Sequence, residues 1–410
     1  MDKNTKKKTL SIASDLIYSI AGLMLMNGML QLLINPTLNN WMGEDAFGNY
    51  QSVLAVVSIM GTTFGVAANY SRMVKHREHK DCNTDYSIFL IIISALCIPV
   101  SAAALIMYKS FTVGAFLLLV PLSIFTVLRY YGDVNYRMNL NYKGFFIYYA
   151  VITLGYCVGL LFYKITGKWE FTILSGELLA FIFVFSSGKI FRGEPFKKSP
   201  YFKENIKSMT VLSSTNIISA VAQNADRIIL RFATGGGDAV TTFYVSTLLG
   251  KVVSLLTTPL NGVLIGYLTK YEGKITKKMY LIFSGALLGV GVIAMAGCYV
   301  GSMIFVKLFY PNVYDAAKSY FFLANAGQIF YFISNCLMTV MLRIANEKYQ
   351  MYLNIVYAVI FAATVLPMTL AMELSGLTYS LLIANMAKFI LIVAVGLIKI
   401  QKDLKKETAE

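Results

Sequence analysis

The sequence predicts an all-α protein that crosses a membrane many times. Apolar residues make up 57% of the 410 residues and charged residues only 14%, against about a quarter charged residues in soluble proteins. The mean hydropathy is +0.62. Twelve apolar segments reach the roughly 20 residues that a helix needs to cross the hydrocarbon core.

We expect each of the twelve segments to be a helix. None of them shows the alternation over about ten residues that is typical of a membrane barrel strand. The expected spans are 14–34, 48–70, 86–108, 112–131, 144–163, 171–191, 209–230, 240–264, 279–305, 317–340, 350–371 and 377–398.

The basic residues predict the orientation of these helices. If the N-terminus lies in the cytoplasm, the cytoplasmic loops hold 27 of the 36 Lys and Arg residues and the outer loops hold 7, while Lys251 and Lys388 lie inside segments. Such an excess of basic residues in cytoplasmic loops is general for membrane proteins. We therefore expect both termini to be cytoplasmic, and we attribute the +15 net charge to basic loops near anionic lipid and not to nucleic-acid binding.

Two six-helix halves are predicted, at residues 1–191 and 209–410, joined by a basic cytoplasmic linker at 192–208. GEDA at 43–46 and GGDA at 236–239 lie 193 residues apart, and each precedes an apolar segment in the first outer loop of its half. A helix-capping Asp explains each copy separately. If they are a true repeat, the halves are related by a pseudo-twofold axis along the membrane normal, with a cavity between them.

Several compositional features exclude other classes of protein. The five cysteines are an odd number and lie mostly in apolar segments, which does not indicate a disulfide framework. No glycine-rich nucleotide-binding loop is present. The only histidines, His76 and His79, lie with Cys82 among four basic residues, which disfavour a metal cation. We therefore expect no cofactor and no metal.

Ionisable residues inside spanning helices are candidate functional residues, because each costs roughly 2.5–3.5 kcal/mol at the membrane centre. Lys251 and Lys388 lie near the middle of the eighth and twelfth segments. The remaining ones are nearer to segment ends: Asp15, Glu177, Asp226, Arg227 and Arg231.

Simpler explanations exist for most of these residues. Asp15 is equally explained as a helix cap, and Glu177 is expected close enough to the outer interface to be hydrated. Arg227 and Arg231 can reach outer water with their long side chains. However, they are four residues apart on one helix face, where like charges repel, and an anion or a wet cavity explains that face better. Asp226 is a candidate partner for Lys251.

A tyrosine-rich cytoplasmic crossover is the second candidate surface. Its residues are Arg129, Tyr130, Tyr131, Tyr136 and Arg137. The simpler interpretation is an interfacial tyrosine belt with cytoplasmic positive charge. The alternative is a vestibule in which tyrosine rings stack on sugars and arginines bind phosphate.

Three short motifs resemble those of the polysaccharide (lipid-linked oligosaccharide) flippases, in the superfamily that also includes multidrug and toxin extrusion transporters. They are MGEDAFGNY at 42–50, NADRIIL at 224–230 and DAVTTFY at 238–244. The topology of the whole chain is also similar to that of this family, with twelve helices in two halves, about 400 residues and no soluble domain.

The resemblance implies a bacterial transporter of the cytoplasmic (inner) membrane. Such a protein flips an oligosaccharide on polyprenyl (pyro)phosphate to the outer leaflet by alternating access, for polysaccharide biosynthesis. Arg227, Arg231, Lys251 and Lys388 are the candidates for the cationic cavity, and Asp15, Asp226 or Glu177 for a coupling ion or a structural acid. Implied partners are the lipid-linked glycan, membrane lipids, the polysaccharide polymerase and glycosyltransferases.

Two rival functions were considered. A cation-coupled multidrug exporter of the same superfamily favours acidic cavity residues, whereas the deepest charges here are lysines. A membrane-embedded polysaccharide polymerase or acyltransferase needs a long outer loop or a catalytic set with His, Asp or Glu. This chain has neither a helical His nor a long outer loop, so we expect no enzyme activity.

Overall fold

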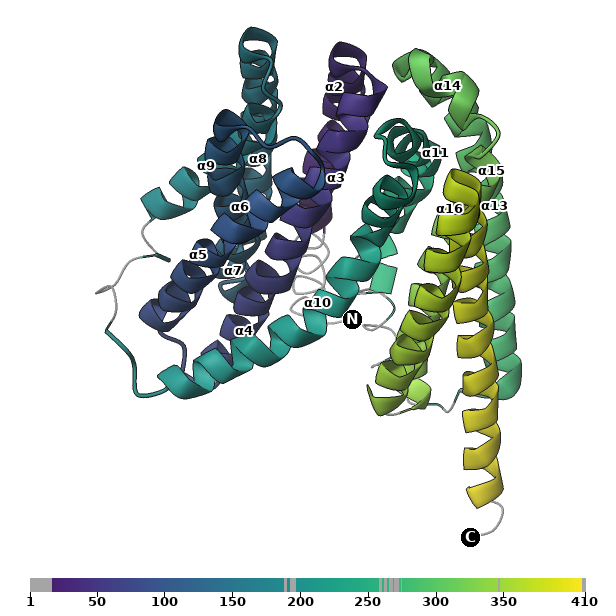
Figure 1. Cartoon of the computed structure of the whole chain (residues 1–410). Coiled ribbons are helices and arrows are strands. Elements are labelled where there is room, and N and C mark those ends of the chain that lie inside the picture. Colours follow the sequence, from purple (N-terminus) through teal and green to yellow (C-terminus); the bar gives the residue numbers. More distant parts are fainter. Residues whose placement is uncertain are drawn as a thin grey trace. The chain divides into compact units, whose positions relative to one another are not determined.

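The computed structural model describes residues 17–187, 190–191, 197–257, 260–261, 264, 268, 273, 275–345 and 347–407. Within these ranges the regular elements are all helices, and the predicted all-α membrane fold is confirmed. The chain forms two compact units, Met1–Ile228 and Ile229–Glu410 (Figure 1), and each is described by itself.

The first unit begins with a helix that runs over Ile17–Met42 and contains a π-helical turn. A second long helix has a π-helical turn in its middle. The elements in chain order are η1 (Leu30–Ile34), α2 (Asn35–Met42), α3 (Glu44–Met60), η2 (Gly61–Gly65), α4 (Val66–Arg77), α5 (Asn83–Met107), α6 (Val113–Gly132), α7 (Val134–Met138), α8 (Tyr142–Thr166), α9 (Glu170–Ser187) and most of α10 (Phe202–Thr234).

The second unit holds the end of α10 and five further helical elements. They are α11 (Asp238–Ser254), α13 (Lys277–Phe309), α14 (Pro311–Ala317), α15 (Phe321–Ile344) and α16 (Glu347–Glu407). The backbone of α16 is non-helical at Glu373, where φ is 49° and ψ is −125°. Gly376 follows, and a side chain there would collide with the carbonyl oxygen of Met368. The element is therefore two helices joined by a tight turn.

Nine helices of the described ranges are long and apolar enough to cross a membrane, six in the first unit and three in the second. The last of these, Tyr349–Lys402, has 54 residues and includes the turn at Glu373. A single straight helix of that many residues would be about 80 Å long at 1.5 Å per residue, which is too long for one crossing. α10 carries charged residues near both of its ends and many uncharged polar residues between them, and α11 is described for only 17 residues. The number twelve stays a prediction.

The two copies of the short repeat both lie at helix starts. Gly43 has a φ of 83° and ends α2, and Glu44 and Asp45 form the first turn of α3. In the second copy, Asp238 lies in the first turn of α11. Acidic residues in a first turn stabilise a helix through its dipole. This role explains both copies, and the pseudo-twofold relation between halves stays a prediction.

Glycines allow a close helix contact in the first unit, between α8 and α9. A Cβ added at Gly155 would lie 2.5 Å from the Cα of Gly176, and one at Gly159 would lie 2.5 Å from the carbonyl oxygens of Phe171 and Thr172. Small residues four apart allow backbones of membrane helices to approach closely. This spacing therefore holds α9, which carries Glu177, against α8.

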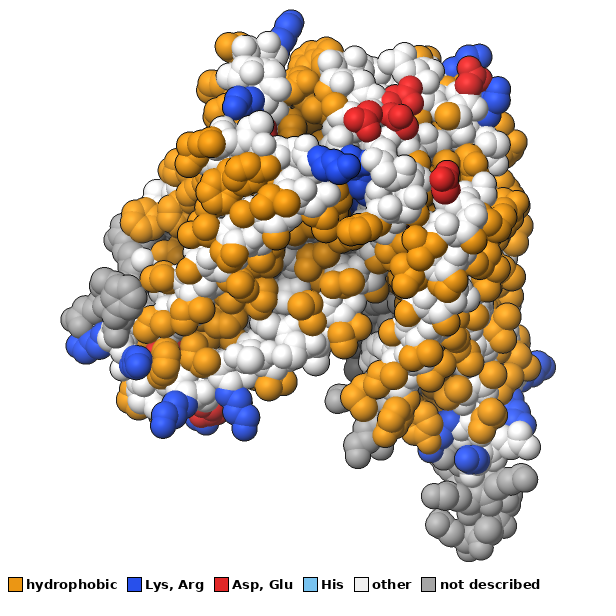
Figure 2. All heavy atoms as spheres, in the orientation of Figure 1, with side chains coloured by type: hydrophobic (Ala, Val, Ile, Leu, Met, Phe, Trp, Pro, Cys, Tyr) orange, Lys and Arg blue, Asp and Glu red, His pale blue; other side chains and the backbone are white. Residues whose placement is uncertain are grey.

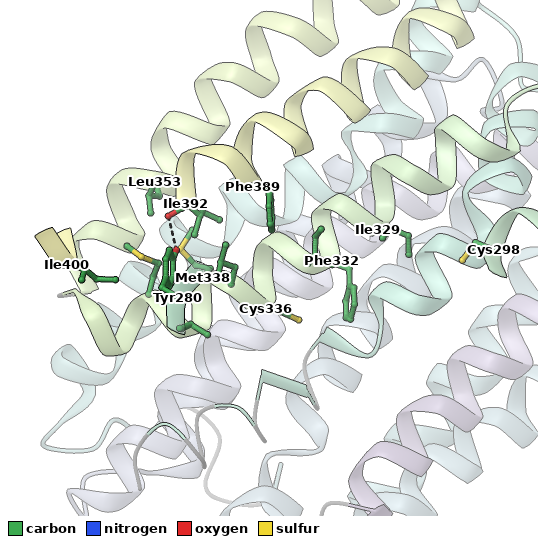
Figure 3. Packing of buried hydrophobic residues seen from close by; sticks show 14 residues of the cluster. Tyr280, Cys298, Ile329, Phe332, Cys336, Met338, Leu353, Phe389, Ile392 and Ile400 are labelled. Carbon is green, nitrogen blue, oxygen red and sulfur yellow. Dashed lines mark hydrogen bonds between the residues drawn. The ribbon is translucent and has the colours of Figure 1, made fainter. Parts of the chain in front are cut away.

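The core of the second unit lies between α13, α15 and the two parts of α16 (Figure 3). Tyr280 of α13 is fully buried, and its hydroxyl donates a hydrogen bond of 2.9 Å to the carbonyl oxygen of Ile392. Phe330 packs edge-on against Phe389, with ring centroids 6.3 Å apart. The core therefore fixes the helix face that carries the neighbouring Lys388.

The surface is that of a membrane protein. On the face shown in Figure 2, hydrophobic side chains cover the sides of the helices, and Lys and Arg lie mainly toward the helix ends. Within the first unit, residues 197–208 pack on α4 and on the start of α5, so α10 begins as a part of this unit. The predicted division at residues 192–208 stays a prediction, whereas the compact units meet at residues 228 and 229, inside α10.

Candidate functional site

Arg227 and Arg231 lie one turn apart near the C-terminal end of α10. Arg227 Nη1 donates to Gln51 Oε1 of α3 at 3.3 Å. The Nε atoms of both arginines are buried and make no hydrogen bond within the described part of the chain. A buried guanidinium donor without an acceptor is costly. These two donors can therefore bind an anionic oxygen.

Gln51 is a site residue that the sequence interpretation missed. Its side chain is 2% exposed, and its Nε2 also makes no hydrogen bond among the described residues. Gln51 and Arg227 thus present two unsatisfied donors beside each other. The signal in the sequence was an amide inside an apolar segment, which is expensive unless it has a partner.

The acidic candidates have different surroundings. Asp226 is 5% exposed, and its Oδ1 accepts a hydrogen bond from the backbone N–H of Arg227 at 2.9 Å. Asp15 lies outside the described residues. Whether Asp226 pairs with Lys251 stays a prediction.

Lys251 is half-buried in the last turn of α11. Its Nζ lies 5.6 Å from the ring centroid of Phe243 and 6.0 Å from that of Tyr244. Both rings belong to the same helix, two turns earlier. The ammonium is therefore held along the aromatic face of α11.

Lys388 lies in an aromatic cage within the second unit. Its Nζ donates to Asn335 Oδ1 at 2.9 Å and lies 4.7 Å from the Tyr331 ring and 4.6 Å from the Tyr357 ring. The residue is 4% exposed. Tyr357 donates in turn to Asn385 Oδ1 at 2.8 Å, which fixes its ring. The cage therefore surrounds the ammonium with neutral groups.

No carboxylate of the described residues lies within ion-pair distance of Lys388. Two cation–π contacts contribute about 0.5–2 kcal/mol each. Burying an ion costs several kcal/mol even after relaxation. These magnitudes are comparable, so the cage attracts the cation without neutralising it.

Arg129 and Glu177 form a buried ion pair in the first unit. Arg129 Nε of α6 lies 2.7 Å from Glu177 Oε2 of α9 and donates to Oε1 at 2.9 Å. The hydroxyl of Tyr156 donates to the same Oε1 at 3.0 Å. Glu177 is 1% exposed. The sequence had suggested a carboxylate hydrated near the outer interface, whereas the structure has it buried and ion-paired inside the unit.

The tyrosines of the predicted cytoplasmic crossover are mostly covered. Tyr131 is 1% exposed, stacks on Tyr86 and accepts a hydrogen bond from Arg72 Nη1. Tyr136 is 7% exposed and packs against Tyr148. In this conformation these two rings are part of the core and do not form an open stacking surface.

Asp133, at the end of α6, is the centre of a polar network. It accepts hydrogen bonds from Asn69, from both Nε and Nη2 of Arg137, and from the hydroxyl of Tyr149. Tyr130 is half-buried, with its ring 4.2 Å below the Arg129 guanidinium. Tyr130 of the predicted vestibule thus contacts the buried ion pair through Arg129.

Polar contacts tie the start of α10, and Ser199 before it, to α4, the α4–α5 loop and the first turn of α5, and we call this set the linker clamp. Glu204 pairs with Lys75 and Lys80. Asp85, fully buried, accepts hydrogen bonds from the backbone N–H and hydroxyl of Ser199 and from Asn205. The hydrogen bond from Lys75 is the main cause that lowers the pKa of Glu204.

No protein-family model and no curated protein sequence matches this chain. Solved structures do. The lipid II flippase MurJ, in an inward closed conformation, has a TM-score of 0.73 at 13% identity, covering 92% of this chain and 87% of that one. An inward-facing multidrug resistance MATE family transporter of the MOP superfamily has a TM-score of 0.64 at 14% identity, with 96% of each chain covered.

A MATE structure in the bent conformation has a TM-score of 0.62 at 15% identity and covers 98% of this chain and 97% of that one. All three likenesses extend over nearly the whole chain. They show that this chain has the fold shared by MATE transporters and MurJ.

Proposed function

We propose that this chain is a membrane transporter that flips an oligosaccharide on polyprenyl phosphate or pyrophosphate to the outer leaflet. The observation that carries the proposal is the pair Arg227 and Arg231, whose buried Nε donors have no acceptor in the described part of the chain. Arginine presents planar donors that suit the oxygens of phosphate. The fold shared with a lipid II flippase supports this substrate class.

The head group would occupy the cationic, polar surroundings of α10 while the lipid tail stays in the bilayer. Gln51 contributes a donor beside Arg227. Pyrophosphate brings acceptors for these donors, and the pairing offsets the cost of removing its charge from water.

The test uses Arg227→Gln and Arg231→Gln in cells that depend on this protein for their surface glycan. A charge-assisted hydrogen bond contributes about 1.5–3 kcal/mol, so we expect glycan export to fall at least about tenfold. Membrane abundance of the folded protein should stay unchanged. Arg→Lys should restore part of the export, because the charge is kept without the planar geometry.

The matched control is Lys318→Gln. Lys318 is an exposed cation directly after α14 that pairs with Asp315 at 2.7 Å. Its loss should leave export unchanged. Normal export by the Arg227→Gln, Arg231→Gln double variant would overturn the proposed substrate site.

Cation-coupled drug export is the second candidate function, favoured by the fold shared with MATE transporters over nearly the whole chain. The proposed acidic residue is Asp226, a carboxylate of α10 that is 5% exposed. Under this alternative, Asp226→Asn should remove resistance to cationic drugs, and Arg227→Gln should leave glycan export intact.

A further inference from the structure

We propose that Lys388 carries the coupling proton, taking up one proton in its aromatic cage and releasing it once in each transport cycle. This inference rests on the proposed function insofar as the chain is a transporter. It moves the coupling role from Asp15 and Asp226, where the sequence had suggested it, to a lysine.

Lys388 is not presented to a ligand. It is 4% exposed, and its Nζ already contacts Asn335, Tyr331 and Tyr357. A phosphate would have to displace these contacts. In contrast, the Nε donors of Arg227 and Arg231 have no acceptor among the residues that the structure describes. Substrate binding and the cage are therefore separate features.

The cage accommodates both protonation states of the Lys388 side chain. The ammonium donates to Asn335 and lies against two rings, and a neutral amine can make the same hydrogen bond to the amide oxygen. A carboxylate partner would lock the charge in place. With neutral partners only, burial opposes the charge of Lys388 and the rings favour it. Small changes in hydration therefore shift the protonation equilibrium of this lysine.

The titratable groups around the cage come from each packed helix. α15 contributes Tyr331 and Cys336, and the first part of α16 contributes Tyr357. α13 contributes Tyr280, whose hydroxyl is bound to the carbonyl of Ile392. α11 contributes Lys251, which lies along its own aromatic residues. Tyrosines and thiols are neutral near pH 7, so Lys388 is the group in the cage that can carry a charge there.

The proton balance is simple. Opening of the cage to water on one side lets the ammonium release its proton to water and become an amine. Opening to the other side lets the amine take a proton from water. One proton thus crosses for each cycle, and a proton gradient drives the substrate step.

The test uses the full chain in phosphatidylethanolamine and phosphatidylglycerol liposomes with a trapped pH dye. The probe is farnesyl-diphosphate-linked N-acetylglucosamine. The wild type should show probe-dependent proton entry when the outside is acidic. Lys388→Arg keeps a permanent charge, so it should still bind the probe within about threefold, while proton entry falls at least about tenfold.

Lys388→Met should also abolish proton entry, because it has no titratable group. The matched control is Lys318→Arg, the same exchange at an exposed lysine of the second unit. It should behave like the wild type. Probe-dependent proton entry that persists in Lys388→Arg would overturn the inference. If both Lys388 variants fold poorly, wild-type protein that binds the probe without moving protons overturns it equally.

The outcomes separate this inference from the proposed function. Wild-type protein that fails to bind the farnesyl probe contradicts glycolipid flipping. A second probe, tetraphenylphosphonium, then tests the coupling alone. Proton entry that depends on tetraphenylphosphonium and is lost in Lys388→Arg would uphold the lysine as proton carrier in a drug exporter, and its persistence in that variant would overturn it.

Discussion

Arg129 and Glu177 are joined across the first unit by an ion pair of 2.7 Å, with their side chains 8% and 2% exposed. The two residues are 48 positions apart in sequence and come from α6 and α9. Tyr156 of α8 donates to the same carboxylate, so three helices meet at this pair. The contact is thus a structural junction within the apolar part of the unit.

We predict that Glu177→Gln lowers the stability of the folded protein. Removal of one partner of a buried ion pair leaves an unpaired charge and costs about 3–5 kcal/mol. Membrane abundance and thermal unfolding in detergent measure the effect. Asp315→Asn is the control, because that pair is exposed at 51% and 83% and exposed pairs contribute about 0–1 kcal/mol.

A double variant makes this prediction stricter. Arg129→Met with Glu177→Leu removes both charges, and well-packed apolar replacements of a buried pair are often neutral. It should therefore unfold at a higher temperature than Glu177→Gln alone. A double variant as unstable as the single one would contradict the ion-pair explanation.

We next predict that Gly159→Ala destabilises the contact between α8 and α9. The added Cβ would lie 2.5 Å from two backbone carbonyl oxygens, which cannot move without shifting the helix. Overpacking of this kind costs about 1–3 kcal/mol. Gly289→Ala in α13 is the control, because nothing lies within 4 Å of its added Cβ. In thermal unfolding measured side by side, Gly159→Ala should unfold at a lower temperature than Gly289→Ala.

Hydropathy predicted most of the fold because bilayer thickness sets the length of each helix. It also placed the turn near residue 374, where α16 breaks at Glu373. Hydropathy did not predict the π-helical turns η1 and η2. Those depend on packing against neighbouring helices, which a single segment does not encode.

The site was predictable only in part. Charge in an apolar segment singled out Lys388, but its cage comes from Tyr331, Asn335 and Tyr357, which are far from it in sequence. Glu177 was expected near water because only its depth in one helix was considered. Its partner Arg129 was assigned to the cytoplasmic crossover, and a long side chain brings the two together.

The orientation gives a third prediction. The distribution of Lys and Arg places Lys198 in the cytoplasm and Gly236 and Leu374 outside. Single cysteines at these positions, with the five native cysteines replaced by serine, should react with an impermeant thiol reagent on intact cells only at the latter two. Labelling at position 198 on intact cells would indicate the opposite orientation and contradict this prediction.

The linker clamp gives a fourth prediction. The hydroxyls of Ser71 in α4 and Ser208 in α10 are 2.9 Å apart, a separation compatible with the Cβ spacing of a disulfide. Ser71→Cys with Ser208→Cys should therefore form an intramolecular disulfide on mild oxidation, detected as a mobility shift on a gel. Ser71→Cys with Thr210→Cys is the control, because Thr210 is exposed on another face of α10. Equal cross-linking of both pairs would contradict the docked position of α10.

The last prediction concerns acid sensitivity of the same clamp. Hydrogen bonds from Lys75 and Lys80 lower the pKa of Glu204, Lys75 first. A carboxyl whose pKa is lowered on folding stabilises the fold above its unfolded value of about 4.3, and this contribution is lost as the pH falls through the folded value. Hydrogen–deuterium exchange of residues 197–208, corrected for intrinsic rates, should therefore stay slow from neutral pH to about pH 5 and rise below it. Glu204→Gln should exchange faster at neutral pH and show no further rise in acid from this group. An identical pH profile for the variant and the wild type would show that Glu204 does not hold the clamp.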